Sequence, residues 1–251
     1  MVDDPPRWEQ GSWLLRHAEW DGVFPADLVT PVFLFFLGAA IPLYGSLRRS
    51  ALFLIAAALC AAGLAVNGLW RSDLATWRVT GVLQRAGVML AIAAAANLGV
   101  AGEFRRRIAV LASAAAFITL TYWLVMAHVG APNGAPGDLL PSDNPAAWVD
   151  RIVLGRHAWS ESWDPDGILS TLSSLSTVLF GLAAGTLLTS TPRGTRPRLQ
   201  LAGAGAGAIV AGLLWTSMVP MNRSLWSGSF VVFSAGVAAI LLSMVGWIQR
   251  R

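Results

Sequence analysis

Seven stretches of mostly apolar residues, each close to 20 residues long, alternate along this chain with polar connections. They cover Asp27–Ser46, Ala51–Trp70, Thr80–Gly99, Ile108–His128, Ile168–Thr189, Gln200–Val219 and Gly228–Trp247. A helix needs about 20 mainly apolar residues to cross the hydrocarbon core of a bilayer. The pattern therefore predicts an all-α fold, a bundle of about seven transmembrane helices that forms a single domain over residues 1–251.

The arginines of the connections are distributed unevenly between the two sides of this bundle. One side collects ten of them, namely Arg48, Arg49, Arg105, Arg106, Arg107, Arg193, Arg196, Arg198, Arg250 and Arg251. The other side has seven, spread over much longer connections. Short arginine-rich loops face the cytoplasm. We therefore expect residues 1–26, the Arg71–Val79 loop, the long loop of residues 129–167 and the Pro220–Ser227 loop to lie outside.

Composition supports the membrane class and excludes several others. The chain is 55% hydrophobic and 13% charged, whereas soluble domains carry about 25% charged residues. The net charge of +4 is therefore not interpreted as a nucleic-acid footprint. The single cysteine, Cys60, excludes a disulfide framework and a cysteine-based metal site. The three histidines are widely scattered, so no metal cofactor is expected.

Glycines in the sixth apolar stretch suggest a helix contact. Gly203, Gly205 and Gly207 alternate with alanines, and Gly203 and Gly207 are about one helical turn apart. Small residues at this spacing let two membrane helices approach closely. The alternative is a helix that is merely rich in small residues.

His17 lies in a short polar loop just before the first apolar stretch. A neutral imidazole can accept a proton or an acyl group near neutral pH. Glu19 and Asp21 are close enough in sequence to orient the ring, and Trp20 could shield it from water. The alternative is that His17 is an ordinary surface histidine. These neighbours favour a catalytic role.

Three further polar residues belong to the same outer side by topology. Arg85 lies about a turn inside the third stretch, Asn67 near the outer end of the second, and Asn222 just after the sixth. Polar groups in membrane helices are costly and often functional. Arg85 could instead extend its head group to the interface. The convergence of these residues with His17 predicts a site at the outer end.

The long loop ends with Asp164 and Asp166, just before the fifth stretch. Asp166 could simply cap the helix that begins there, whereas Asp164 is harder to explain as a cap. A helix N-terminus can also bind anions or hydroxyl groups. The same loop is rich in tryptophan and aspartate, a combination that suits a sugar, although tryptophan is also common at membrane interfaces.

Five segments that include these residues resemble a known family. They are LRHAEWDG followed by PADLVTPVFLFFLG (Leu15–Gly38), RVTGVLQR (Arg78–Arg85), NPAAWVDRIVLGRH (Asn144–His157), DPDGILSTLSSLSTVLFGLAAG (Asp164–Gly185) and PMNRSLWSGSFVVFSAG (Pro220–Gly236). In this order they resemble the multi-pass acetyltransferases related to heparan-α-glucosaminide N-acetyltransferase, including their bacterial relatives.

The resemblance implies acetyl transfer from cytosolic acetyl-CoA to the amine of a terminal glucosamine across the membrane. His17 matches the family's active histidine, and Asn222 and Arg85 match residues that line its pore. Family members have a spanning helix before the histidine loop and further helices after the Pro-x-Asn segment. We therefore expect this chain to be a shortened member.

Together these observations predict an acetyltransferase of a bacterial inner membrane, with His17 on the non-cytoplasmic side. The expected substrate site comprises Asp164, Asp166, Asn222, Asn67, Arg85 and Trp20. The coenzyme phosphates are expected at Arg48, Arg49 and Arg105. The expected partners are an amino sugar and the lipid bilayer, with a homodimer left open. The alternatives are a sugar-binding permease or sensor without chemistry, and an inactive truncated homologue.

Overall fold

The computed structural model describes residues 13–45, 48–70, 73–100, 102–132, 134–190 and 194–248. Within them the chain is helical. The elements are a 3-10 turn η1 (Pro25–Leu28), α1 (Val29–Leu43), α2 (Arg49–Trp70), α3 (Val82–Gly99), α4 (Phe104–His128), α5 (Pro145–Val153), a 3-10 turn η2 (Gly155–His157), α6 (Ile168–Thr189), α7 (Arg196–Trp215) and α8 (Gly228–Ile248). Seven helices are long and apolar enough to cross a membrane, which confirms the predicted polytopic all-α fold.

The predicted stretches match the long helices closely, with two informative differences. Helix α7 begins at Arg196, four residues earlier than predicted, because Pro197 fits the first turn of a helix. The long loop also contains α5, which hydropathy did not indicate. This short helix begins where the Asn144 side chain accepts a hydrogen bond from the Ala147 amide, with Pro145 in its first turn. Such a cap is a strong helix-start signal.

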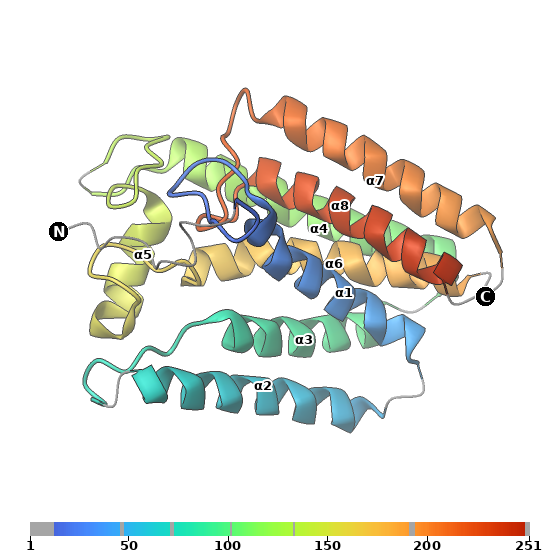
Figure 1. Cartoon of the computed structure of the whole chain (residues 1–251), viewed down its shortest axis with the longest axis horizontal. Helices are drawn as coiled ribbons and strands as arrows, with labels where there is room; N and C mark the ends of the chain where they lie inside the picture. The colour runs from blue at the N-terminus through green and yellow to red at the C-terminus, as the bar shows by residue number, and fades with distance from the viewer. Residues whose placement is uncertain are drawn as a thin grey trace.

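Helix α6 forms the centre of the bundle. It packs against α1 and α4 and also contacts α3 and α8, while α2 covers α3 and α7 covers α8. Figure 1 shows the long helices running side by side, with the α2–α3 pair along one edge and α7 along the other. The core between them is apolar and includes Leu34, Met89, Val178, Leu182 and Phe230.

Close approach between helices occurs at glycines on α1, α6 and α8. A Cβ added at Gly181 or Gly185 would collide with the α1 backbone, and one at Gly38 would collide with α6. On α7 the contacting residues are Gly205 and Gly212, which pack on α8, whereas Gly203 and Gly207 have no atom within 4 Å of such a Cβ.

The close approach expected of the glycines on this helix is therefore present at Gly205, whereas the spaced pair Gly203 and Gly207 does not make it. The glycine pair that allows the closest approach is Gly181 and Gly185, one helical turn apart on α6.

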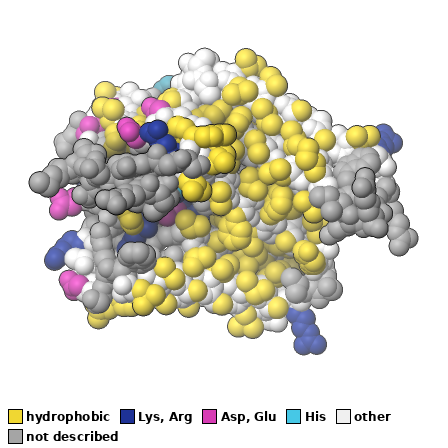
Figure 2. All heavy atoms as spheres, viewed as in Figure 1, with side chains coloured by type: hydrophobic (Ala, Val, Ile, Leu, Met, Phe, Trp, Pro, Cys, Tyr) yellow, Lys and Arg dark blue, Asp and Glu magenta, His cyan; other side chains and the backbone are white. Residues whose placement is uncertain are grey.

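The two ends of the bundle differ from its middle. In Figure 2 hydrophobic side chains cover the long middle of the visible face, while charged side chains gather toward the ends. The loops before α1, around α5 and between α7 and α8 meet at one end, which is on the left in Figure 1. We call this the histidine end. The opposite end carries the arginines that flank α2, α4 and α7, namely Arg48, Arg49, Arg105, Arg106, Arg107, Arg196 and Arg198. Arg71, Arg193, Arg250 and Arg251, used in the sequence argument, lie outside the described residues.

Candidate functional site at the histidine end

A buried carboxylate holds His17 in place. Asp27 is 1% exposed, and its Oδ1 lies 2.7 Å from His17 Nδ1. Its Oδ2 accepts hydrogen bonds from the backbone amides of Phe24 at 2.8 Å and Ala18 at 3.2 Å. The turn that begins at Pro25 places Asp27 beneath the loop, so the carboxylate fixes both the backbone and the imidazole. The His17 side chain itself remains 39% exposed.

This geometry determines which nitrogen of His17 is available. An imidazole Nδ1–H that donates to a carboxylate leaves Nε2 as the basic nitrogen. The orienting carboxylate is Asp27, ten residues along the chain. It is therefore neither Glu19 nor Asp21, the two neighbours that sequence proximity suggested.

The loop between α7 and α8 completes the surroundings of His17. Asn222, fully buried, donates from Nδ2 to Asp21 Oδ1 at 3.2 Å, and the Gly22 amide donates to the Met221 carbonyl at 2.8 Å. Arg223 adds a positive charge 3.9 Å from Asp27 Oδ1. The predicted meeting of His17 and Asn222 at one end is thus present in the structure, across 200 residues of chain.

Trp20 joins the histidine loop to the long loop. Its Nε1 donates to the Leu139 carbonyl at 2.9 Å, and its ring packs edge-on against Trp163 with centroids 5.1 Å apart. Trp20 is partly buried, so it closes the histidine loop against the rest of this end.

A second polar cluster surrounds Asp164. Arg78 donates to both of its oxygens, at 2.7 and 3.3 Å, and the Thr80 hydroxyl donates at 2.6 Å. Burial would raise the pKa of Asp164, but the hydrogen bonds and charge of Arg78 outweigh burial and hold this pKa below its usual value. The carboxylate also accepts the backbone amides of Trp159 and Asp166. Asp164 therefore organises the end of the long loop.

Arg85 belongs to α3, and its buried guanidinium lies beside the start of α6. It is 2% exposed and donates to Ser170 Oγ at 2.8 Å, the Pro165 carbonyl at 3.0 Å and Thr171 Oγ1 at 3.2 Å. Asp166 Oδ1 lies 3.5 Å from its Nε. The alternative in which Arg85 extends to the membrane interface is wrong, because its head group is enclosed by protein.

Trp226 connects the two clusters. Its ring lies 4.6 Å from the Arg85 guanidinium carbon, and Trp226 belongs to the same loop as Asn222 and Arg223. Its φ of 54° is the one positive value found among the non-glycine residues that the structure describes. Ser173 and Thr177 of α6 hydrogen-bond to its carbonyl and its indole. A non-glycine residue in this conformation persists only where its surroundings enforce it.

Asn67 is committed to the backbone. Its Nδ2 donates to the carbonyls of Arg78 at 2.8 Å and Thr80 at 2.7 Å. It thereby ties the end of α2 to the segment that carries Arg78, so its contact with the site is through that segment.

The candidate coenzyme arginines lie at the opposite end of the bundle. Arg49 lines a cavity of about 350 Å³ together with Asn97 and Arg107. Arg105 lines a second cavity, of about 630 Å³, that also contains Arg196. Arg48 is exposed nearby at the start of α2. Helices of about 20 residues are about 30 Å long, so these arginines and His17 are separated by the length of the bundle.

The described residues contain no group of three or more His, Cys, Asp or Glu side chains that could hold a metal ion.

Sequence reasoning missed three residues of this end: Asp27, Arg78 and Trp226. Asp27 carried a signal, because a carboxylate at the start of an apolar stretch requires a partner when it is buried. Arg78 lies in a connection and is paired with carboxylates more than 80 residues away, so its role depends on the fold. The positive φ of Trp226 could not be predicted from its being a tryptophan.

Comparison with known proteins yields two relatives. The chain is 25% identical to heparan-alpha-glucosaminide N-acetyltransferase of Homo sapiens over 298 aligned positions, which cover 92% of this chain and 44% of that protein. The same values hold for the enzyme of that name from Mus musculus. No family model matches the chain. The chain thus spans less than half the length of the relatives it matches.

Proposed function

Because this chain is a distant relative of the heparan-α-glucosaminide N-acetyltransferases, we propose that it is a multi-pass membrane acetyltransferase that moves an acetyl group from acetyl-CoA to the amine of an amino sugar. The observation that carries the proposal is the His17–Asp27 pair, with its 2.7 Å contact. It places an oriented, accessible imidazole at one end of a bundle that spans the membrane. This pair is the proposed catalytic centre.

The reaction needs a base, and the pair supplies one. The amine nitrogen attacks the carbonyl carbon of the acetyl thioester, a C–N bond forms, and the C–S bond breaks to release the thiol. His17 Nε2 removes the proton from the amine and returns it to the thiolate sulfur. Asp27 stabilises the imidazolium that forms. In a two-step route Nε2 attacks the thioester and accepts the acetyl group as the thiol leaves, and the amine then takes the acetyl group from Nε2. The overall reaction is the same.

The surrounding residues have distinct proposed roles. Trp20, in the histidine loop, would position the sugar with its aromatic face. Asn222 is fully buried and bonded to Asp21 and Leu225, so we assign it to holding the loop between α7 and α8 against the histidine loop. Asp164 and Asp166 already bind Arg78 and Arg85, so we assign them to holding the loop in shape. Arg85 keeps the start of α6 polar beneath the site.

The donor is proposed to enter from the opposite, cytoplasmic end. Arg49 and Arg105 line cavities there that could hold coenzyme phosphates, with Arg48 nearby. A donor bound at that end must bring its acetyl group through the bundle to reach His17. From the arginine distribution we propose that the membrane is a bacterial inner membrane and that the histidine end lies on its non-cytoplasmic side.

The test uses purified protein in liposomes, acetyl-labelled acetyl-CoA and glucosamine. We expect labelled N-acetylglucosamine from the wild type and a loss of about 100-fold or more in His17→Ala. His128→Ala is the matched control, because His128 is an exposed histidine at the end of α4. Glucosamine binding or uptake that is indifferent to acetyl-CoA and to His17 would instead indicate a permease or sensor.

A further inference from the structure

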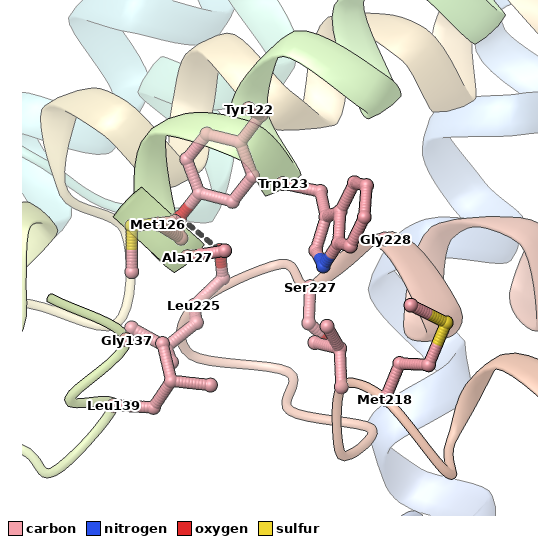
Figure 3. A pocket seen from close by; sticks show the side chains of 11 residues that line it. Tyr122, Trp123, Met126, Ala127, Gly137, Leu139, Met218, Leu225, Ser227 and Gly228 are labelled. Atoms are coloured by element: carbon pink, nitrogen blue, oxygen red, sulfur yellow. Dashed lines mark hydrogen bonds between the residues drawn. The ribbon is translucent and has the colours of Figure 1, made fainter. Parts of the chain in front are cut away.

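A small apolar pocket opens at the histidine end between α4 and the loop that precedes α8. Its volume is about 160 Å³, and its walls include Tyr122, Trp123 and Met126 of α4 together with Leu139, Met218 and Leu225. Figure 3 shows Tyr122 and Trp123 projecting from α4 toward the Leu225–Ser227 segment, with Leu139 on one side and Met218 on the other.

The two hydroxyl groups in this wall, of Tyr122 and Ser227, are already paired. The Tyr122 hydroxyl donates to the Leu225 carbonyl at 2.6 Å, the dashed line in Figure 3. Ser227 Oγ donates to the Pro220 carbonyl at 2.9 Å and accepts the Asn222 amide at 3.0 Å. These two hydroxyls therefore offer a ligand little, and an apolar group fits best against the apolar side chains around them. Two methionines in the wall can adapt to its shape.

The pocket lies near the end of α4, where a spanning helix would leave the hydrocarbon core of a bilayer. Residues 122–127 are within about 10 Å of the end of α4 at His128. Trp123 packs edge-on against Trp215 of α7, with centroids 5.8 Å apart, and tryptophan is enriched at this level of membranes. Met218 is 66% exposed, so the mouth opens on the outside of the bundle, where the acyl chains of a bilayer would meet its head groups.

Two walls of the pocket are bonded to the histidine loop and its partner loop. The Leu139 carbonyl accepts the Trp20 indole at 2.9 Å, and the Leu225 amide donates to Asn222 Oδ1 at 2.8 Å. Trp20 also packs against the cluster formed by Tyr122, Met126 and Leu225. Trp20 and Asn222 thus connect the pocket wall to the loops around His17.

We propose that this pocket binds the aliphatic chain of the acceptor, so that the substrate is an amino sugar attached to a lipid. This proposal rests on the proposed function and specifies its acceptor class. Sites for drug-sized ligands have about 300–1,000 Å³, so the smaller pocket holds only the first few methylene groups next to the sugar. Each buried methylene should then tighten binding about fourfold.

The kinetic test compares free glucosamine with alkyl glucosaminides of increasing chain length in lipid nanodiscs. We expect KM to fall about fourfold per methylene over the first few carbons and then to level off. Ala127 of α4 also lines the pocket, so a phenylalanine there should fill it. Ala127→Phe should therefore abolish this gain while leaving the kinetics with glucosamine unchanged.

Leu124→Phe is the matched control, because Leu124 lies on the same helix and is 46% exposed on its outer face. Met218→Trp, which covers the mouth, replaces Ala127→Phe if that variant does not fold. A KM that does not depend on chain length, or equal losses with both acceptors in Ala127→Phe, would overturn the proposal.

A binding test separates this proposal from the proposed reaction. An octyl glucosaminide with a diazirine near its sugar should label residues 122–127 or 218–225, and Ala127→Phe should remove the label. Labelling of this kind would support the pocket assignment even if no acetyl transfer were detected. The absence of transfer would refute only the proposed reaction. Equal labelling by an octyl diazirine without a sugar would show that the pocket takes bilayer chains, and would contradict the acceptor assignment.

Discussion

At the scale of single residues, the histidine end is stabilised by buried charges whose partners come from other segments. Asp27 holds His17, Asp164 holds Arg78, and Arg85 is surrounded by the start of α6. A buried charge is strongly destabilising when its partner is removed. These pairs therefore fix how the loops fit together, and they explain why the site is built from four separate stretches of chain.

Asp150 gives a pH-dependent prediction at this scale. Burial raises the pKa of Asp150 to about 6, although its carboxylate accepts the Ile168 amide at 2.8 Å. The folded protein therefore binds a proton between about pH 4 and 6 that the unfolded chain has released. Its free energy of unfolding should fall as pH rises through this range. Asp150→Asn, which keeps an acceptor for Ile168, should not show this loss.

The measurement is the difference in melting temperature between Asp150→Asn and wild type at pH 4 and pH 8. We expect the variant to gain relative to wild type by a few degrees at the higher pH, about 2–4 °C for each kcal/mol. A difference that is the same at both pH values would show that the Asp150 carboxylate is not disfavoured by burial.

Residue type and topology were sufficient to bring His17, Arg85 and Asn222 to one end, because each span reverses the direction of the chain. They were not sufficient to find the partners. The pairing of His17 with Asp27 depends on the turn at Pro25–Leu28. The pairing of Arg78 with Asp164 bridges 86 residues. Both depend on backbone geometry that residue types alone do not define.

At the scale of elements, hydropathy located the long helices well but not their contacts. Which glycine faces a neighbour depends on the rotation of each helix about its axis, and this rotation was not deduced for α7. Gly205 and Gly212 face α8, whereas Gly203 and Gly207 do not. Hydropathy also did not predict helix α5, because nine residues in a polar loop do not form an apolar stretch long enough to span a membrane. Its Asn144-Pro145 start was the available local indication.

The contact between α1 and α6 predicts a contrast between two glycine substitutions. A Cβ at Gly181 would collide with the backbone at Phe35 of α1, the helix that follows the η1 turn containing Asp27. Gly181→Ala should therefore destabilise the protein by about 1–3 kcal/mol and lower its melting temperature. Gly203→Ala, in open space, should be neutral or slightly stabilising, since alanine favours helices. Equal effects of the two variants would argue against the close α1–α6 approach.

At the scale of the whole molecule, the bundle has two chemically distinct ends joined by an apolar middle. Carboxylates, His17 and aromatic side chains lie at one end, and arginine-lined cavities lie at the other. This polarity is what a protein needs if it takes a donor from one side of a membrane and modifies an acceptor on the other. The orientation is proposed from the arginine distribution.

Orientation can be measured with single cysteines, because Cys60 is the chain's one cysteine. In a Cys60→Ala background, Glu161→Cys places a thiol in the long loop and Glu103→Cys places one just before α4. Both glutamates are exposed, so the pair is matched. A membrane-impermeant maleimide added to intact spheroplasts should label the first variant and not the second. The reverse pattern would invert the proposed topology.

The central claim is that His17 and Asp27 act as one catalytic unit. The most direct test is a double-mutant cycle on the rate of labelled amide formation, with His17→Ala, Asp27→Asn and the double variant at saturating donor and acceptor. Asp27→Asn alone should reduce the rate by about 100-fold or more. Residues that act as a unit are strongly non-additive, so the double variant should be no slower than His17→Ala. Fully multiplicative losses, or an Asp27→Asn enzyme with the wild-type rate, would contradict the account.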